Sequence, residues 1–391
     1  MIKTSSLLRS ASLITLLGVL VGCGNSTASS SSSTDSSSLS DPFLHVYALL
    51  PNTTVPGSFT IKAFNTSNGN SSVLNSQFGT GVGDNPVLIR THPNINVFYV
   101  LNNGSATVSQ YTMDKNGGAS FLGTVATPVN PTLIAIHPSG GYVYVVGGAA
   151  NAPGLIRRFS VTGDGVLDNP LDVATTNNYS TSTDYVKDAD FSFAGGTFHL
   201  PCVGAIESYP INSDGTLGPA VQSLATAAPT GDAGDNYRDI DVRPGQASLC
   251  AVVNAVNGND KVRSYAVDNG SLSAVQEADT GDLRLGMGCM ASNAQYYVGS
   301  ASNPHMFGFN VDNSTGTLGA LATNPMAVGS SISSTFVKLD PTNNFMVSTG
   351  GPGDQALVSR FRGSSGEFVG SSSDSQSLTN PSGFDFFAFI F

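Results

Sequence analysis

Charged side chains recur at one position of a sequence pattern that repeats along this chain. The repeats align on a His-Pro step, as in His137-Pro138, and the position three residues before the proline is charged in five of seven repeats. The charged residues at this position are Arg90, Asp190, Asp241, Lys338 and Asp385, and the other two repeats carry Ala135 and Gly288. Because only 11% of the chain is charged, this position is strongly enriched in charge.

Three further charged residues, Asp188, Arg238 and Asp239, lie two or three residues before this charged position, which we call the charged column. Clustered carboxylates raise one another's pKa, as a general base requires, so Asp190 and Asp241 are candidate catalytic residues. Mixed charges also suit a polyhydroxy or carboxylate ligand. The candidate ligand-binding residues are Arg90, Asp188, Asp190, Arg238, Asp239, Asp241, Lys338 and Asp385.

The acids also suit the binding of a divalent metal, and the candidate ligands are Asp188, Asp190, Asp239 and Asp241. No other cofactor is predicted. The alternative is structural, because charges of both signs around a narrow axis can simply pair with one another.

The elements that must position these residues are short strands. An aromatic residue recurs every 44 to 56 residues, each time in a strand pattern followed by a Gly/Asn/Asp turn. The recurring aromatics are Phe64, Tyr111, Phe159, Tyr209, Tyr265, Phe309 and Phe361. This period is typical of a β-propeller with one four-stranded blade per repeat, whose inner strands would carry the charges around a central channel.

The two ends of the folded part predict how the first and last blades are joined. Residues 43–50 align with the second strand of a blade, whereas residues 381–391 align with a first strand. We therefore expect an all-β, seven-bladed propeller over residues 42–391, closed by pairing of the C-terminal strand with the N-terminal blade.

The repeat resembles that of a known family. The pattern Pro-x-x-Ile-x-x-His-Pro-x-Gly, then Tyr-Val-x-Val and a Tyr/Phe-x-Val-x-x-x-Gly-x-Leu hairpin, is similar to the seven-bladed lactonases, including 6-phosphogluconolactonase-like proteins, over roughly residues 43–391. The resemblance implies hydrolysis of a lactone. Enzymatic members carry a Pro-His-x-His segment where this chain has residues 184–188 without histidine, so no catalytic residue is transferred.

The N-terminus predicts export. Lys3 and Arg9 precede an apolar run that ends in Leu20-Val21-Gly22-Cys23. This segment resembles a bacterial lipoprotein signal, which implies a signal peptide over 1–22, cleavage before Cys23 and lipid attachment there. Residues 23–41 are Ser-rich and read as a tether to the propeller domain at 42–391. We expect a lipid-anchored protein of the bacterial cell envelope, at the outer membrane.

Composition excludes several classes of partner and fold. A net charge of −11 without a basic stripe argues against nucleic-acid binding. The chain has no tryptophan, so it is not a WD40 propeller. A disulfide between Cys250 and Cys289 and a pair of buried free thiols are both compatible with the pattern.

Two functions remain. The first is binding of a small polar ligand or a protein partner at the channel mouth, which the missing histidine motif favours. The alternative is hydrolysis of a sugar lactone or related ester, which the resemblance and the acidic cluster favour.

Overall fold

The computed structural model describes a large part of the chain. The described residues are 44–51, 59–65, 72–76 and 83–388, except for 115–117, 150–152, 179–187, 193–194, 203–204, 226–235, 243–247, 255–258, 283–284, 291–293, 301–304, 313, 322–323, 328–335, 340–344, 351–354, 363–366, 369–374 and 378–382. The predicted signal peptide and tether lie outside these residues. Within the described part, no helix is long and apolar enough to cross a bilayer.

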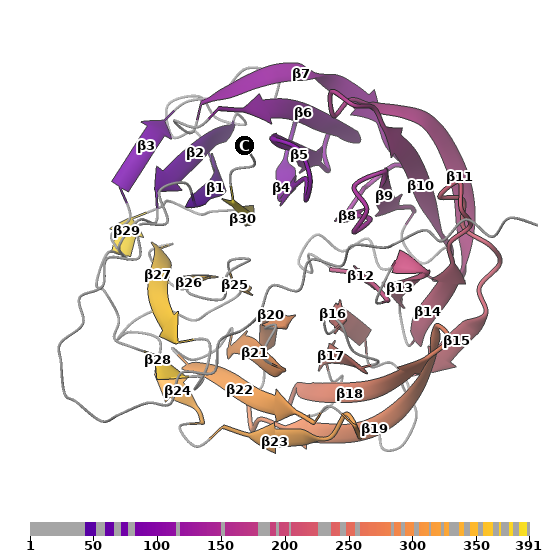
Figure 1. Cartoon of the computed structure of the whole chain (residues 1–391), viewed down its shortest axis with the longest axis vertical. Helices are drawn as coiled ribbons and strands as arrows, with labels where there is room; N and C mark the ends of the chain where they lie inside the picture. The colour runs from indigo at the N-terminus through magenta and orange to yellow at the C-terminus, as the bar shows by residue number, and fades with distance from the viewer. Residues whose placement is uncertain are drawn as a thin grey trace, which may run out of the picture. The chain divides into compact units, whose positions relative to one another are not determined.

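The described residues form seven antiparallel sheets, which we number as blades along the chain with the inner strand first (Figure 1). Blade 1 comprises β30 (Gly383–Ala388), β1 (Leu44–Pro51), β2 (Phe59–Asn65) and β3 (Ser72–Ser76). Blade 2 comprises β4 (Pro86–Thr91), β5 (Val97–Asn102), β6 (Thr107–Met113) and β7 (Ala119–Ala126). Blade 3 comprises β8 (Leu133–Ile136), β9 (Tyr142–Gly147), β10 (Pro153–Val161) and β11 (Leu167–Asn178). Blade 4 comprises β12 (Asp190–Phe191), β13 (Thr197–Cys202), β14 (Ala205–Pro210) and β15 (Gln222–Ala225).

The remaining three blades follow the same order. Blade 5 comprises β16 (Asn236–Val242), β17 (Ser248–Asn254), β18 (Lys261–Asp268) and β19 (Ser271–Asp279). Blade 6 comprises β20 (Leu285–Met290), β21 (Gln295–Ser300), β22 (His305–Val311) and β23 (Leu318–Ala320), with β24 (Met326–Ala327) also on β22. Blade 7 comprises β25 (Phe336–Leu339), β26 (Phe345–Gly350), β27 (Gln355–Arg362) and β28 (Glu367–Phe368), with β29 (Ser375–Ser377) also on β27. Each recurring aromatic lies on the third strand of its blade, which confirms the predicted repeat.

The first blade combines strands from distant parts of the chain. β30 pairs antiparallel with β1, with Asp385 opposite Tyr47 and Gly383 opposite Leu49. β30 also contacts β4 of blade 2 and β25 of blade 7. The pairing between a C-terminal first strand and an N-terminal second strand is the one that the repeat alignment predicts.

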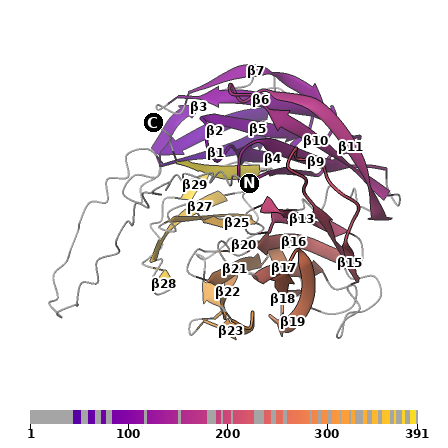
Figure 2. The same cartoon turned by 45° about the vertical axis from the view of Figure 1, so that its right-hand side comes forward.

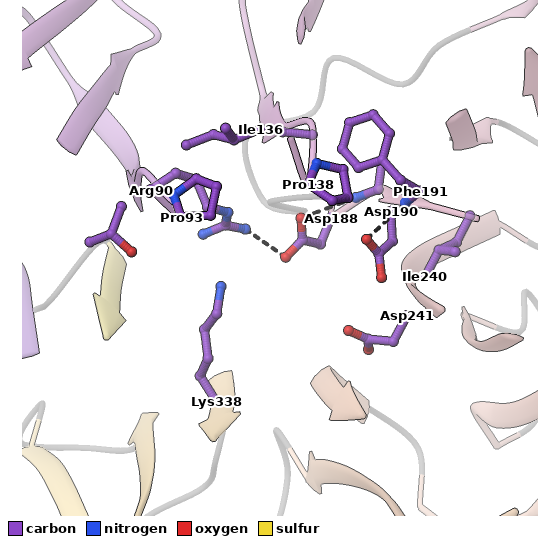
Figure 3. Close-up of a pocket in the computed structure, with 13 residues that line it drawn as sticks. Arg90, Pro93, Ile136, Pro138, Asp188, Asp190, Phe191, Ile240, Asp241 and Lys338 are labelled. Atoms are coloured by element: carbon purple, nitrogen blue, oxygen red, sulfur yellow. Dashed lines mark hydrogen bonds and ion pairs between the residues drawn. The ribbon is translucent and has the colours of Figure 1, made fainter. Parts of the chain in front are cut away.

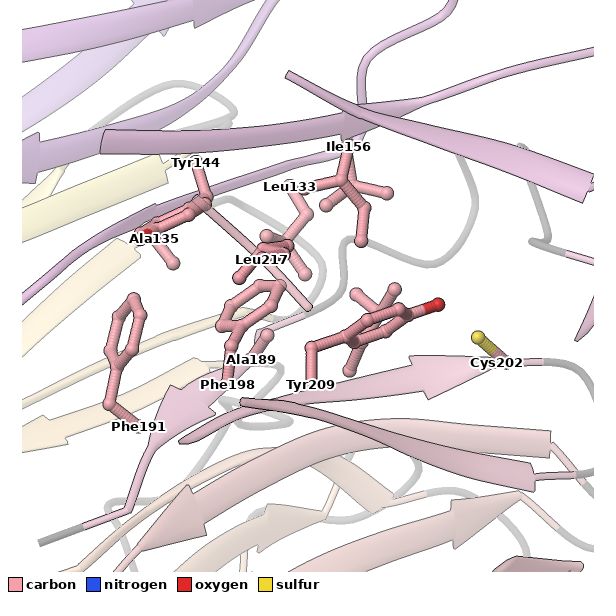
Figure 4. Packing of buried hydrophobic residues seen from close by; sticks show 12 residues of the cluster. Leu133, Ala135, Tyr144, Ile156, Ala189, Phe191, Phe198, Cys202, Tyr209 and Leu217 are labelled. Carbon is pink, nitrogen blue, oxygen red and sulfur yellow. The ribbon is translucent and has the colours of Figure 1, made fainter. Parts of the chain in front are cut away.

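The hydrophobic core lies between neighbouring blades. One cluster joins Leu133, Tyr144 and Ile156 of blade 3 to Phe198 and Tyr209 of blade 4, and all five side chains are buried (Figure 4). Figure 2 shows the same packed sheets from a second direction. Because alternate side chains of a strand point to opposite faces, each blade contributes to the cores on both of its sides.

Outer hairpins reach across to the preceding blade. Gly165 in the β10–β11 turn accepts a hydrogen bond from the Tyr99 hydroxyl of blade 2, at 2.9 Å. Gly215 in the β14–β15 turn accepts one from the Tyr144 hydroxyl of blade 3, at 2.7 Å. Gly215 has a φ of +77°, and a Cβ there would lie 2.4 Å from the ring of Tyr142. Glycine is therefore required at this turn for both its conformation and its close contact.

The two His-Pro histidines have a structural role, as their repeated position predicts. His92 Nε2 hydrogen-bonds the Gly140 carbonyl of the next blade at 2.8 Å, and His137 Nε2 hydrogen-bonds the Gly195 carbonyl of blade 4 at 2.9 Å. The Nδ1 atoms accept backbone N–H groups of the following turn, from Asn94 and from Ser139 respectively. Each histidine thus joins its own turn to the neighbouring blade.

Candidate functional site

A cavity of about 290 Å³ opens among the inner strands of five blades. Its walls come from β4, β8, β12, β16 and β25 and from the residues beside them (Figure 3). This volume is near the lower limit for small-molecule sites, so the cavity suits a ligand the size of one sugar ring.

Five of the eight predicted ligand-binding residues line this cavity. They are Arg90, Asp188, Asp190, Asp241 and Lys338. The structure does not bring Asp239 to the cavity wall, because its side chain is fully buried. Arg238 lies on β16 and Asp385 on β30, but their side chains are outside the described part of the structure.

An ion pair crosses the cavity from blade 2 to blade 4. Arg90 Nη2 donates to Asp188 Oδ2 at 2.6 Å, and Arg90 Nη1 donates to the Ile89 carbonyl at 3.0 Å. The Ala189 N–H donates to the other oxygen of Asp188 at 3.1 Å. Arg90 is only 9% exposed, so the pair is largely shielded from solvent. These contacts fix the guanidinium plane beside the cavity.

Asp190 is held by backbone amides of two blades. Its Oδ1 accepts the Phe191 N–H at 2.8 Å, and its Oδ2 accepts the Val242 N–H of blade 5, also at 2.8 Å. Burial raises the pKa of Asp190 to about 7, and the negative charge of Asp188 adds to this, although both amides and Lys338 oppose it. A carboxyl group with this pKa is half ionised near neutral pH.

Asp241 has no such support. Its Oδ2 is buried and has no hydrogen-bond partner among the described residues. Burial raises its pKa well above the ordinary value, with further contributions from Asp239, Asp190 and Asp188, while Lys338 lowers it. Burial therefore favours the protonated form of Asp241, which lies across the cavity from Arg90 (Figure 3).

Asp239 connects blades 5 and 6 behind the cavity. Its Oδ2 accepts the Gly288 N–H at 2.5 Å and the Tyr296 hydroxyl at 3.4 Å. Burial is the main reason that its pKa is raised, followed by the charge of Asp188. Part of the predicted charged ring thus stabilises contacts between blades, as the structural alternative proposed.

The predicted metal cage does not fit this arrangement. Among the described residues, no three His, Cys, Asp or Glu side chains are placed to hold a metal ion. Asp188 is directed to Arg90, and Asp190 and Asp239 are directed to amides of neighbouring blades. No chemical step below is assigned to a metal.

Two features of the cavity were not expected from the sequence. Pro93 and Pro138 of the His-Pro steps form part of its wall, together with Phe191. Each proline lies three residues after the aligned position of its repeat, just beyond the end of the inner strand. This spacing was the signal that would have placed both prolines at the cavity. The cavity wall therefore combines charged side chains with apolar ones.

Neither His199 nor the three cysteines of the described residues line this cavity. Cys202, Cys250 and Cys289 are buried and are not joined in disulfides. His199 is opposite Asp190 in the sheet, and its Nδ1 hydrogen-bonds Ser208 Oγ at 2.9 Å. Burial lowers the pKa of His199 to about 4, so the ring is neutral.

Comparisons with known proteins agree with this architecture. The family model described as lactonase, 7-bladed β-propeller matches residues 48–187 and 99–289. A search of curated protein sequences found no match to the chain.

Several solved structures share the fold. A candidate 6-phosphogluconolactonase of Bacteroides uniformis is 14% identical, with a TM-score of 0.71 over 88% of this chain and 99% of that one. A similar protein of Bacteroides fragilis is 15% identical, with a TM-score of 0.70 over 90% and 99%. The periplasmic gluconolactonase of Pseudomonas aeruginosa is 16% identical, with a TM-score of 0.67 over 88% and 99%.

The family match spans more than half of the chain, and the seven sheets of the described residues agree with it. The chain therefore belongs to the lactonase family of seven-bladed β-propellers.

Proposed function

We propose that this protein hydrolyses a sugar lactone in the cavity between its inner strands. The observation that carries the proposal is the placement of two acids with different hydrogen-bond partners in one small cavity. Both oxygens of Asp190 accept backbone N–H groups, which favours its ionised form, whereas Asp241 has a buried oxygen with no partner among the described residues, and burial favours its protonated form. Two acids whose surroundings favour different forms are what a general base and a general acid require.

The reaction needs one water molecule and the lactone. Ionised Asp190 removes a proton from water as its oxygen attacks the carbonyl carbon. The Lys338 ammonium points into the cavity and stabilises the negative charge that develops on the carbonyl oxygen (Figure 3). The ring C–O bond then breaks, and Asp241 donates its proton to the departing oxygen. The product is the open-chain hydroxy acid, and proton exchange with solvent resets both acids.

The remaining charged groups position the substrate. The Arg90–Asp188 pair offers a donor and an acceptor at one wall, which suits the hydroxyl groups of a sugar. Three carboxyl groups line the cavity against two cations. This balance disfavours a doubly charged phosphate group, so we propose a neutral sugar lactone as substrate.

A direct test follows proton release from a panel of sugar 1,5-lactones, with the spontaneous rate subtracted. We expect catalysed turnover by the full chain and a loss of at least about 100-fold in both Asp190→Asn and Asp241→Asn. Asp172→Asn is the matched control, because Asp172 pairs with Arg157 on the outer strands, away from the cavity. Absence of turnover in the folded wild-type protein, or full activity in both variants, would refute the proposal.

Binding without catalysis is the second candidate. The interblade contacts of Asp190 and the absence of the histidine motif favour it, since both are compatible with a purely structural charge ring. A small polar ligand or a protein partner at the channel mouth would then be the function. The family and the separated acid states support the hydrolase better.

We also propose that the enzyme acts in the bacterial envelope. This proposal is supported by the N-terminal segment up to Cys23, which resembles a lipoprotein signal. A lipid anchor on Cys23, at the outer membrane, would expose the propeller to lactones outside the cytoplasm.

A further inference from the structure

The cavity acid Asp241 and the buried acid Asp239 each keep one oxygen without a partner. Within the described residues, Asp239 Oδ1 and Asp241 Oδ2 are both buried and make no hydrogen bond to a donor. An unsatisfied buried carboxylate oxygen costs free energy, and two adjacent ones cost more. If both residues were ionised, each would therefore have one buried oxygen without a hydrogen-bond donor.

The backbone brings these two side chains to the same side of β16. They are two residues apart on one strand, so both point toward blade 6. Their carboxyl groups lie within hydrogen-bonding reach of each other. Asp239 is held in place from behind by the Gly288 N–H and the Tyr296 hydroxyl, which both bind its Oδ2.

The surroundings favour a single negative charge on this pair. Asp188 and Asp190 add negative charge from blade 4, and Lys338 adds a positive charge from blade 7. Tyr296, Cys250 and Cys289 pack nearby, and burial raises the pKa of Tyr296, which keeps it neutral. Because several acids face this pair, a second negative charge on it would be repelled.

We propose that Asp239 and Asp241 share one proton between Asp239 Oδ1 and Asp241 Oδ2, and that Asp239 is a positioning residue that keeps Asp241 in its protonated form. The shared proton gives both orphan oxygens a partner. The pair itself follows from the geometry of β16, whereas its catalytic consequence rests on the proposed lactone hydrolysis.

Asp190 provides the contrast within the same site. Both of its oxygens accept backbone N–H groups, so it needs no shared proton and is free to act as a base. The proton-sharing pair and the amide-supported acid thus divide the two catalytic tasks between blade 5 and blade 4.

The first experiment is the pH profile of kcat/KM for Asp239→Asn in the full chain. Asparagine can still accept the Gly288 N–H and can donate to Asp241, so the packing is kept. Without a neighbouring negative charge, Asp241 ionises more easily, and the alkaline limb should move to lower pH by about one unit or more. Activity should recover toward the wild-type value below the new limb. A uniform loss at every pH would overturn the proposal.

The matched control is Asp260→Asn. Asp260 is also buried and accepts a backbone N–H of blade 6, that of Leu285, at 2.9 Å, but it does not line the cavity. This variant should leave the pH profile unchanged. The same shift in both variants would mean that loosening the contact between blades 5 and 6 causes it, and the proposal would fail.

The second experiment does not depend on activity. Infrared spectra of protein with ¹³C-labelled aspartate at pH 8, where Asp190 is ionised, should show a protonated carboxyl band in the wild type. The band should disappear in both Asp239→Asn and Asp241→Asn and persist in Asp260→Asn. Its absence from the wild type, or its survival in Asp239→Asn, would overturn the shared proton. If the wild type hydrolyses no lactone but shows this pattern, only the proposed function fails.

Discussion

The raised pKa of Asp190 predicts that this side chain makes the fold less stable as the pH rises. In the folded protein its pKa is about 7, against an ordinary value of 3.8. The folded state therefore binds this proton more tightly than the unfolded state, so stability is highest below the unfolded pKa and falls as the pH rises toward the folded pKa. Replacement by asparagine removes the titration while keeping the shape of the side chain.

The size of the effect follows from the two pKa values. At pH 5 the folded state is nearly fully protonated at Asp190, and the penalty is about 1.7 kcal/mol; at pH 8 it is about 4 kcal/mol. The stability of Asp190→Asn relative to the wild type should therefore increase by roughly 2–3 kcal/mol between pH 5 and pH 8. The charge-dependent part of the amide contacts is already contained in the folded pKa, and any loss that does not depend on charge shifts both values together and leaves this difference intact.

The assay is denaturant unfolding of both proteins at the two pH values. Asp172→Asn is the control, because Arg157 lowers the pKa of Asp172 through a hydrogen bond and its titration is complete below pH 5. Its effect on stability should be the same at pH 5 and pH 8. An equal effect of Asp190→Asn at the two pH values would show that Asp190 is ionised throughout, and the assignment of a near-neutral base would be wrong.

Three further predictions concern the site, the fold and the anchor. Lys338→Met should move the acid limb of kcat/KM, set by Asp190, to higher pH, because the ammonium stabilises the ionised carboxylate; an unmoved limb would contradict this. Gly215→Ala should lower the free energy of unfolding by at least about 1–2 kcal/mol, because its φ is positive and the new methyl meets an aromatic ring of blade 3. Gly163→Ala is the neutral control in the same denaturation assay, because open space surrounds that position. Cys23→Ala should abolish metabolic labelling with palmitate and release the protein from the membrane fraction; retained label would exclude lipidation at this residue.

The repeat pattern predicted the blades because each one is a local unit. Tyr111, Phe159 and Tyr209 mark the third strands correctly, since turn residues and strand alternation are readable within about fifty residues. The charged column likewise placed Asp190 and Asp241 on inner strands beside one cavity.

The contacts between blades could not be predicted in the same way. Asp188, Asp239 and Asp241 share one strand parity in the sequence, yet Asp188 binds Arg90 and Asp239 binds the Gly288 N–H. These partners depend on the register of one blade against another, which a repeat alignment does not contain. The hypothesis of a divalent metal held by the acids was inferred from parity alone, and parity does not determine where these side chains point.

The pairing of β30 with β1 has a consequence for biogenesis. Blades 2 to 7 are each built from strands that follow one another, so each can form as soon as its own segment of the chain has been synthesised. β1 must wait for a strand that begins at Gly383. Until then its inner edge presents unpaired N–H and C=O groups, which chaperones or a second unfinished chain can bind. Folding should therefore be most sensitive to changes in β30, even where these leave the finished cavity untouched.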